Sequence, residues 1–153
     1  MTIYLVRHAK AGSRDRWEGD DALRPLSGKG REQARRIGEA LAGEGVTALV
    51  SSPYVRCVQT LEPLGERCDL EVVPDARLAE ETPFEQVLDL LAEVPDGAVL
   101  CSHGDVIPDT MAALERRGCR IDGRADWRKA TVWRLERDAD GSFVAASVTP
   151  PPD

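Results

Sequence analysis

The feature that most constrains the fold is a regular alternation between short apolar runs and longer segments with helical periodicity. The apolar runs are "IYLV" (3–6), "TALVS" (47–51), "LEVV" (70–73) and "AVLC" (98–101). Runs of this length are typical of strands that are buried on both faces. Because such strands alternate with helical segments, we expect a mostly parallel sheet with helices on both sides. The pattern therefore predicts a three-layer α/β/α sandwich.

The segments between these runs carry signals for where helices begin and end, and the C-terminal part has the pattern of a hairpin. "TVWRL" (131–135) and "FVAASVT" (143–149), joined at Asp140-Gly141, predict an antiparallel edge to the sheet. At 153 residues, one domain covering 1–153 is expected. The predicted helix signals are Ser27 with Gly43 and Gly45, Ser52-Pro53 with Gly65, the capping box Thr82-Pro83-Phe84-Glu85, and Gly118 after a helix through Ile107, Met111 and Leu114.

Charge and cysteine content narrow the class of protein. The net charge of −7 argues against nucleic acid or an anionic membrane as partner. Residues 1–36, however, carry nine Lys/Arg against five Asp/Glu, which predicts a local positive field for a small anion. The four cysteines lack metal-type spacing, and the first apolar run is too short for a signal peptide or a membrane span. We expect a cytoplasmic protein, and the sequence leaves its oligomeric state open.

The two histidines of the chain both follow predicted buried strands. His8 comes after "IYLV" and His103 after "AVLCS", and ligands of open α/β sheets bind at such strand ends. Arg7 precedes His8, and Arg56 lies near the start of the helix after the second strand. Guanidinium groups and helix N-termini both suit phosphoryl oxygens. These residues predict a site for a phosphoryl group.

Four motifs resemble the successive signatures of a known family. "LVRHAKAG", "RPLSGKGREQA", "SSPYVRCVQT" and "LCSHGDVI" occur in the order found in the histidine phosphatase superfamily, which has the phosphoglycerate mutase-like fold. Within it, the chain is similar to the short phosphohistidine phosphatases. It is also similar to the phosphatase domain that some bacteria fuse to a Nudix hydrolase. The resemblance runs from residue 3 to about residue 110.

The resemblance implies a role for each matching residue. His8 would be the transiently phosphorylated nucleophile, and Arg7, Arg56 and His103 would bind the phosphoryl oxygens. The loop "RLAEETPFE" would supply a general acid, with Glu80 at the best-matching position and Glu81 as its neighbour. Ser13 and Arg24 are implied as further substrate contacts, although Arg24 could instead pair with Asp20 or Asp21. No metal or other cofactor is implied.

The predicted function is a metal-independent phosphatase that acts on a phosphomonoester or on protein phosphohistidine through a phosphohistidine intermediate. A phosphoglycerate mutase-type phosphotransferase and a non-catalytic phosphate-binding module are the alternatives. Two positions depart from the family pattern: Ala9 replaces the usual glycine, and Lys10 replaces a frequent acidic residue. Trp17 is interpreted either as a surface for stacking a nucleobase or as a packing residue. Asp105 is interpreted as the first residue of a helix, and Gln59 and Thr60 as structural residues behind the site.

Overall fold

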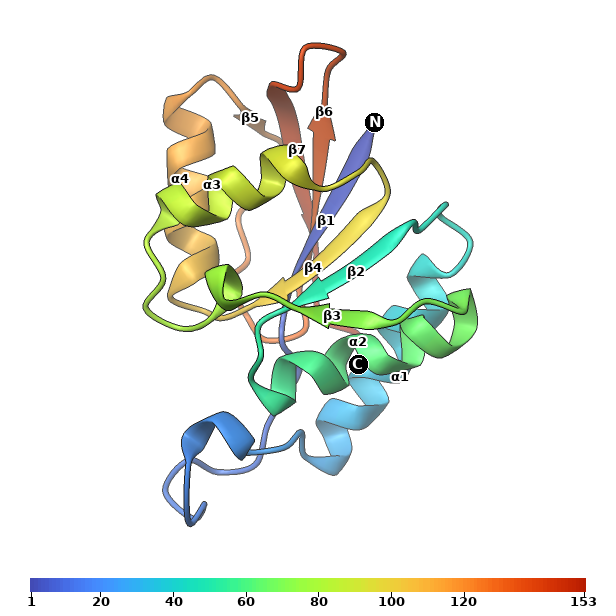
Figure 1. Ribbon diagram of the computed structural model, residues 1–153, viewed down its shortest axis with the longest axis vertical. Coiled ribbons are helices and arrows are strands. Elements are labelled where there is room, and N and C mark those ends of the chain that lie inside the picture. The colour runs from blue at the N-terminus through green and yellow to red at the C-terminus, as the bar shows by residue number, and fades with distance from the viewer.

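A computed structural model describes residues 1–153 and contains one seven-stranded sheet, in the order β3-β2-β4-β1-β6-β7-β5 (Figure 1). The four strands β3, β2, β4 and β1 are parallel, β6 is antiparallel to both β1 and β7, and β5 is parallel to β7. The predicted parallel sheet with an antiparallel C-terminal edge is therefore confirmed. The strands are β1 (Thr2–Arg7), β2 (Ala48–Ser51), β3 (Val72–Pro74), β4 (Ala98–Ser102), β5 (Arg120–Ile121), β6 (Val132–Arg137) and β7 (Phe143–Thr149).

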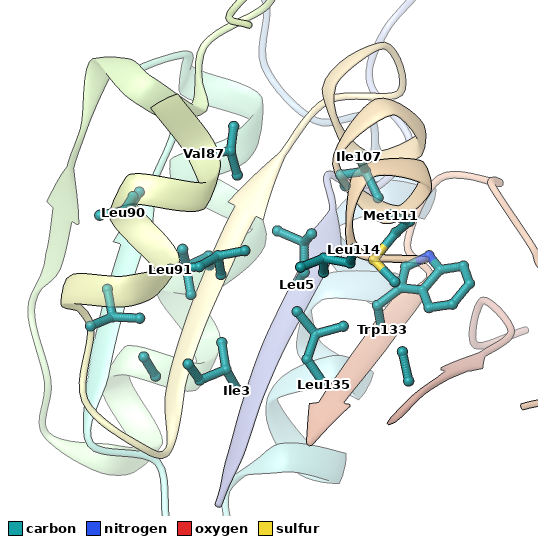
Figure 2. Close-up of a cluster of buried hydrophobic side chains, with 14 of the residues drawn as sticks. Ile3, Leu5, Val87, Leu90, Leu91, Ile107, Met111, Leu114, Trp133 and Leu135 are labelled. Atoms are coloured by element: carbon teal, nitrogen blue, oxygen red, sulfur yellow. The ribbon is translucent and has the colours of Figure 1, made fainter. Parts of the chain in front are cut away.

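Helices cover both faces of the sheet, as the alternating pattern predicts. The helices α1 (Gly28–Leu41) and α2 (Val55–Cys68) lie on one face, and α3 (Phe84–Glu93) and α4 (Val106–Arg116) lie on the other (Figure 1). Side chains of β1 alternate between the two layers: Ile3 and Leu5 pack on the α3–α4 side, and Tyr4 and Val6 on the α1–α2 side. Figure 2 shows the α3–α4 side, where Leu5 packs near Trp133 beneath the helices.

The register of the parallel strands sets where the polar residues lie. Arg7 at the end of β1 pairs with Ser102 at the end of β4, and Cys101 pairs with Ser51 at the end of β2. The three carboxyl ends therefore meet at one edge of the sheet. Whatever follows these strands is brought together there.

Several predicted helix boundaries are confirmed. Ser27 caps α1, because its Oγ accepts a hydrogen bond from the Gly30 N–H at 3.1 Å. Gly118 follows the end of α4 in the left-handed region, with φ +103°. The predicted hairpin is present as β6 and β7, with Gly141 in its turn at φ +84°.

The predicted boundaries of α2 are wrong at both ends. This helix begins at Val55 rather than at Pro53, and Ser52 does not cap it. It continues beyond Gly65 to Cys68 and ends at Asp69, which adopts φ 55°. Gly65 is instead required by close packing, because a Cβ there would lie 2.7 Å from the Leu70 carbonyl oxygen. Gly65 thus lies inside α2 and does not mark its end.

The predicted capping box of α3 is also wrong. Pro83 occupies the N-cap position, so the helix begins at Phe84, and no side chain caps it. Thr82 Oγ1 instead donates a hydrogen bond to the Ala76 carbonyl at 3.3 Å. The third strand lies at Val72–Pro74 rather than at 70–73, and neither β5 nor the 3₁₀ helices η1 (Asp21–Leu23) and η2 (Ala76–Leu78) were predicted. No helix combines the length and the apolar character needed to cross a membrane.

Candidate active site

A polar cavity of about 620 Å³ lies at the carboxyl edge of the parallel strands. Ala11 is the single hydrophobic residue in its lining. A cavity with this composition suits a charged ligand rather than an apolar one. The lining residues are Arg7, His8, Lys10, Ala11, Gly12, Ser13, Arg14, Arg24, Glu80, Glu81, His103, Gly104, Asp105 and Lys129.

His8 lies directly beyond β1 and is 5% exposed. Its Nδ1 lies 2.8 Å from the carbonyl oxygen of Ala9. Because a carbonyl only accepts hydrogen bonds, Nδ1 carries the proton and Nε2 keeps the lone pair. Burial, aided by the positive charges of Arg56 and Arg7 and by His103, lowers the pKa of His8 to about 3. The imidazole is therefore neutral at physiological pH, which is the form that can act as a nucleophile.

His103 lies directly beyond β4, beside His8. The two ring centroids are 5.4 Å apart, and the rings meet edge to face. His103 Nε2 lies 2.8 Å from Ser52 Oγ, which orients the ring. Its Nδ1 lies 3.5 Å from Glu80 Oε1 and has no hydrogen-bond partner in the protein. The two histidines, 95 positions apart in the sequence, thus share one cavity.

Arg56 is fully buried in the first turn of α2. Its guanidinium donates to the Asp21 carbonyl at 2.9 Å, to Asp21 Oδ2 at 3.1 Å and to Glu80 Oε1 at 2.6 Å. Arg56 does not line the cavity. It lies behind the carboxylate of Glu80, which does.

Arg7 ends β1 and points its guanidinium along the cavity wall. One of its terminal nitrogens donates to the Trp127 carbonyl at 2.5 Å, and its buried Nε has no partner in the protein. A Cβ at Gly104 would lie 2.6 Å from Arg7 Cζ, so only glycine leaves room for this guanidinium. Burial lowers the pKa of Arg7, and the charge of Asp105 opposes that shift.

The two implied substrate contacts, Ser13 and Arg24, both line the cavity. Arg24 also pairs with Asp21, at 2.9 Å, and donates to the Gly12 carbonyl at 2.6 Å. It therefore fixes the loop after β1 as well as facing the cavity. Trp17 does not line the cavity, and its indole N–H donates to the Asp20 carbonyl at 2.9 Å.

Glu80 and Glu81 occupy one turn at the rim of the cavity. Glu80 is the one whose carboxylate contacts Arg56 and approaches His103. Glu81 adopts φ +67°, and its backbone N–H donates to Asp105 Oδ2 at 2.8 Å. The Asp105 side chain therefore links the start of α4 to the turn that carries Glu81. The sequence does not predict this contact.

Sequence reasoning did not single out Lys129 or Arg14 as cavity residues. Lys129 precedes β6, and Ala130 N donates to the Arg7 carbonyl at 3.1 Å, so the antiparallel edge brings this lysine to the rim. Burial and then the charges of Arg7, Arg24, Lys10 and Arg14 lower its pKa. The sequence predicts the hairpin of β6 and β7 but not the pairing of β6 with β1, and it is this pairing that brings Lys129 to the cavity.

Comparison with known proteins places the chain in a family. Residues 3–82 match the sequence profile of the histidine phosphatase superfamily (branch 1). The chain belongs to the histidine phosphatase superfamily. The assignment made from the four sequence motifs is therefore confirmed, and the cavity described above lies where those motifs meet.

Two curated relatives in the comparisons extend beyond this chain. An 8-oxo-(d)GTP phosphatase of Mycolicibacterium smegmatis is 35% identical over 160 residues, covering 99% of this chain and 49% of that protein. A probable phosphoglycerate mutase GpmB of Citrobacter koseri is 33% identical over 85 residues, covering 52% of this chain and 38% of that protein. The chain thus spans half or less of the length of these relatives.

Solved structures match the fold over almost the whole chain. The protein histidine phosphatase SixA complexed with tungstate has a TM-score of 0.76 at 20% identity, covering 99% of this chain and 96% of that one. A putative phosphohistidine phosphatase SixA from Nakamurella multipartitia has a TM-score of 0.71 at 25% identity, covering 99% and 95%. The phosphoglycerate mutase-like fold expected from the sequence is confirmed.

Both departures from the histidine phosphatase pattern have a place in the structure. The Ala9 side chain is buried in the core, and its N–H donates to Thr60 Oγ1 at 3.0 Å. Lys10 faces the cavity, while its backbone N–H is held by Gln33 Oε1 at 3.0 Å. Gln59 accepts from the Leu26 N–H at 2.8 Å, so it and Thr60 are structural, as predicted.

Proposed function

We propose that this chain is a phosphatase that transfers a phosphoryl group from its substrate to His8 and then to water. The observation that carries the proposal is the state of His8. Its imidazole is neutral, Nδ1 is bonded to the Ala9 carbonyl, and Nε2 is free beside His103 and Arg7. The superfamily assignment supports the same chemistry.

In the first step, His8 Nε2 forms a bond to phosphorus while the bond from phosphorus to the leaving oxygen breaks. The electron pair of that bond stays on the leaving oxygen, which takes a proton from Glu80. Arg7 and His103, which line the cavity, stabilise the negative charge on the transferring group, which is the main requirement in phosphoryl transfer. Arg56 holds the Glu80 carboxylate from behind. Arg7 Nε and His103 Nδ1 are buried donors without protein partners, which suits them to phosphoryl oxygens.

In the second step, a water oxygen forms a bond to phosphorus and the bond between nitrogen and phosphorus breaks. The electron pair returns to Nε2, and Glu80 takes the proton of the water. Glu80 suits this double role because its carboxylate lies 3.5 Å from His103 Nδ1 and lines the cavity.

No metal ion takes part in this proposal. No three His, Cys, Asp or Glu side chains lie close enough together to hold one. Activity that is unchanged by EDTA would support this part, and activity that EDTA abolishes and Mg²⁺ restores would contradict it.

The test of the mechanism combines turnover with trapping. The wild-type chain is expected to hydrolyse p-nitrophenyl phosphate, and His8→Ala is expected to lose at least about 10³-fold in kcat. Glu44→Ala, which lies away from the cavity, serves as the matched control. Quenching wild type in alkali during turnover should leave acid-labile phosphate on His8. Turnover without such phosphate would overturn the mechanism.

Substrate identity is the finer part of the proposal. The fold is that of SixA-type phosphohistidine phosphatases, whereas a relative that matches 99% of this chain is an 8-oxo-(d)GTP phosphatase. We therefore propose a phosphorylated metabolite, a nucleotide or a phosphohistidine protein as substrate class. Comparing kcat/KM for these three classes distinguishes them, and equal, very low values for all would contradict each.

A further inference from the structure

Asp105 makes a contact that its position does not explain. It occupies the N-cap position of α4, where aspartate ordinarily accepts a hydrogen bond from its own helix, yet it makes no such bond. Instead, Asp105 Oδ2 accepts from the backbone N–H of Glu81 at 2.8 Å, across 24 positions of sequence. The side chain therefore links α4 to a different segment.

That segment is a strained turn. The Thr82 N–H donates to the Ala79 carbonyl at 3.3 Å, which closes a turn over residues 79–82. Glu81, its third residue, adopts φ +67°, as the third residue of a type II turn requires. A residue other than glycine is strained in this region and persists where its surroundings hold it. The bond to Asp105 is such a restraint.

The turn carries Glu80 as its second residue. The Glu80 carboxylate lies 2.6 Å from Arg56 and 3.5 Å from His103 Nδ1. Asp105 follows His103 by two positions, so its bond to Glu81 ties the acid-bearing turn to the segment that carries His103. We propose that Asp105 is a positioning residue that holds the carboxyl group of Glu80 beside His103, where it can protonate the leaving group.

This proposal rests on the proposed role of Glu80 as the general acid. It also has a competitor, because Asp105 lines the cavity and its charge favours the protonated form of Arg7. The two roles differ in what they require. Holding the turn requires an acceptor at the position of Oδ2, which asparagine can supply. Acting on Arg7 requires the negative charge, which asparagine lacks.

The experiment compares two substrates that need a general acid to different degrees. p-Nitrophenyl phosphate has a good leaving group, whereas β-glycerophosphate has a poor one and depends on protonation. Asp105→Ala is expected to lower kcat/KM, which reports the first step alone, about 10- to 100-fold on β-glycerophosphate, with less than about 3-fold change on p-nitrophenyl phosphate. Asp105→Asn should retain most of the activity on both. Asp109→Ala, an exposed change in the first turn of the same helix, is the matched control.

A glycine at position 81 tests the strain directly. Glycine adopts a positive φ without cost, so the turn no longer needs the Asp105 bond. In an E81G background, adding Asp105→Ala should therefore cost less than about 3-fold in kcat/KM on β-glycerophosphate. If Asp105→Ala fails to fold, Asp105→Leu, which is similar in size to aspartate and has no hydrogen-bond acceptor, is expected to give the same selective loss.

The outcomes separate this proposal from the one it rests on. Equal losses on both substrates in Asp105→Ala and Asp105→Asn would overturn it in favour of the charge on Arg7. Wild-type activity of Asp105→Ala on both substrates would overturn it outright. Glu80→Gln is expected to lose kcat/KM selectively on β-glycerophosphate, and if it does not, the failure lies in the role of Glu80 itself.

Discussion

At the scale of single residues, the three consecutive residues that follow β4 have three different roles at the same cavity. His103 faces His8, Gly104 leaves room for the Arg7 guanidinium, and Asp105 holds the Glu81 N–H. Each depends on a different property: a ring nitrogen, the absence of a side chain and a carboxylate oxygen. Substitutions here should therefore affect activity through separate causes.

Gly104→Ala should impair catalysis while the fold survives. Its new Cβ would lie 2.6 Å from Arg7 Cζ, and the flexible arginine can move away from it. A displaced guanidinium no longer meets the phosphoryl group, so we expect kcat/KM to fall about 10- to 100-fold with little change in Tm. Gly43→Ala, where a Cβ has open space, is the control. Unchanged activity of Gly104→Ala would show that Arg7 is dispensable.

Burial of His8 should make the stability of the protein depend on pH. The folded-state pKa is about 3, below the value near 6.5 expected in the unfolded chain, so only the unfolded state gains a proton between these values. The contribution of neutral His8 to stability is complete above about pH 6.5 and is lost as pH falls toward 3. From pH 7 to pH 5, wild type should lose about 2 kcal/mol more than His8→Gln.

Urea denaturation of both proteins at the two pH values checks this expectation. The comparison cancels the titration of the carboxylates that the two proteins share. A gap between wild type and variant that stays constant with pH would mean that His8 takes up its proton in the folded protein.

At the scale of elements, the start of α1 holds the loop that follows His8. The Lys10 carbonyl accepts from both the backbone N–H and the Oγ of Ser27, at 3.0 and 3.1 Å. Gly30 lies so close that a Cβ there would be 1.8 Å from this carbonyl oxygen. The helix and the cavity loop are thus packed backbone against backbone.

Gly30→Ala should destabilise the fold. Unlike the contact at Gly104, this one is with backbone, which cannot swing aside, so overpacking of about 1–3 kcal/mol is expected. Gly28→Ala in the same turn has open space and should change the free energy of unfolding little. Chemical denaturation measures both. Equal stability of the two variants would contradict the packing described for α1.

At the scale of the whole molecule, the cavity lining carries a positive net charge although the chain as a whole is negative. The chain carries −7, yet its cavity is lined by five Lys/Arg side chains and three carboxylates. Arg7, Lys10 and Lys129 form no ion pair within 4 Å of a carboxylate, whereas Arg24 and Arg14 pair with Asp21. The cavity is therefore a local attractor for anions in an acidic protein.

Salt should weaken the use of anionic substrates. Exposed charges are screened at ionic strengths above about 0.1 M, so kcat/KM for p-nitrophenyl phosphate is expected to fall between about 0.02 and 0.3 M NaCl. Lys129→Met should lower kcat/KM at low salt and flatten this dependence. Steady-state kinetics across the salt series measure both effects. A slope identical in wild type and Lys129→Met would exclude this lysine from the attraction.

The sequence by itself determined the layered α/β architecture and the meeting of His8 and His103 at one edge of the sheet. Apolar runs of strand length must be buried, and their alternation with helical segments leaves few arrangements. The ends of parallel strands necessarily share an edge, so His8 and His103 could be placed together before any coordinates. Arg7 followed from the same argument and from the family motifs, whereas Arg56, predicted to bind phosphoryl oxygens, lies behind Glu80 and outside the cavity lining.

Only the tertiary structure decided how these residues are held. Ser52 was predicted as a helix cap and instead contacts His103, and Gly65 was predicted as a helix end and instead packs against Leu70. The bond from Asp105 to Glu81 could not be predicted. The physical reason is that local patterns report which backbone a residue favours, whereas a contact between distant segments depends on register and packing that no local pattern encodes.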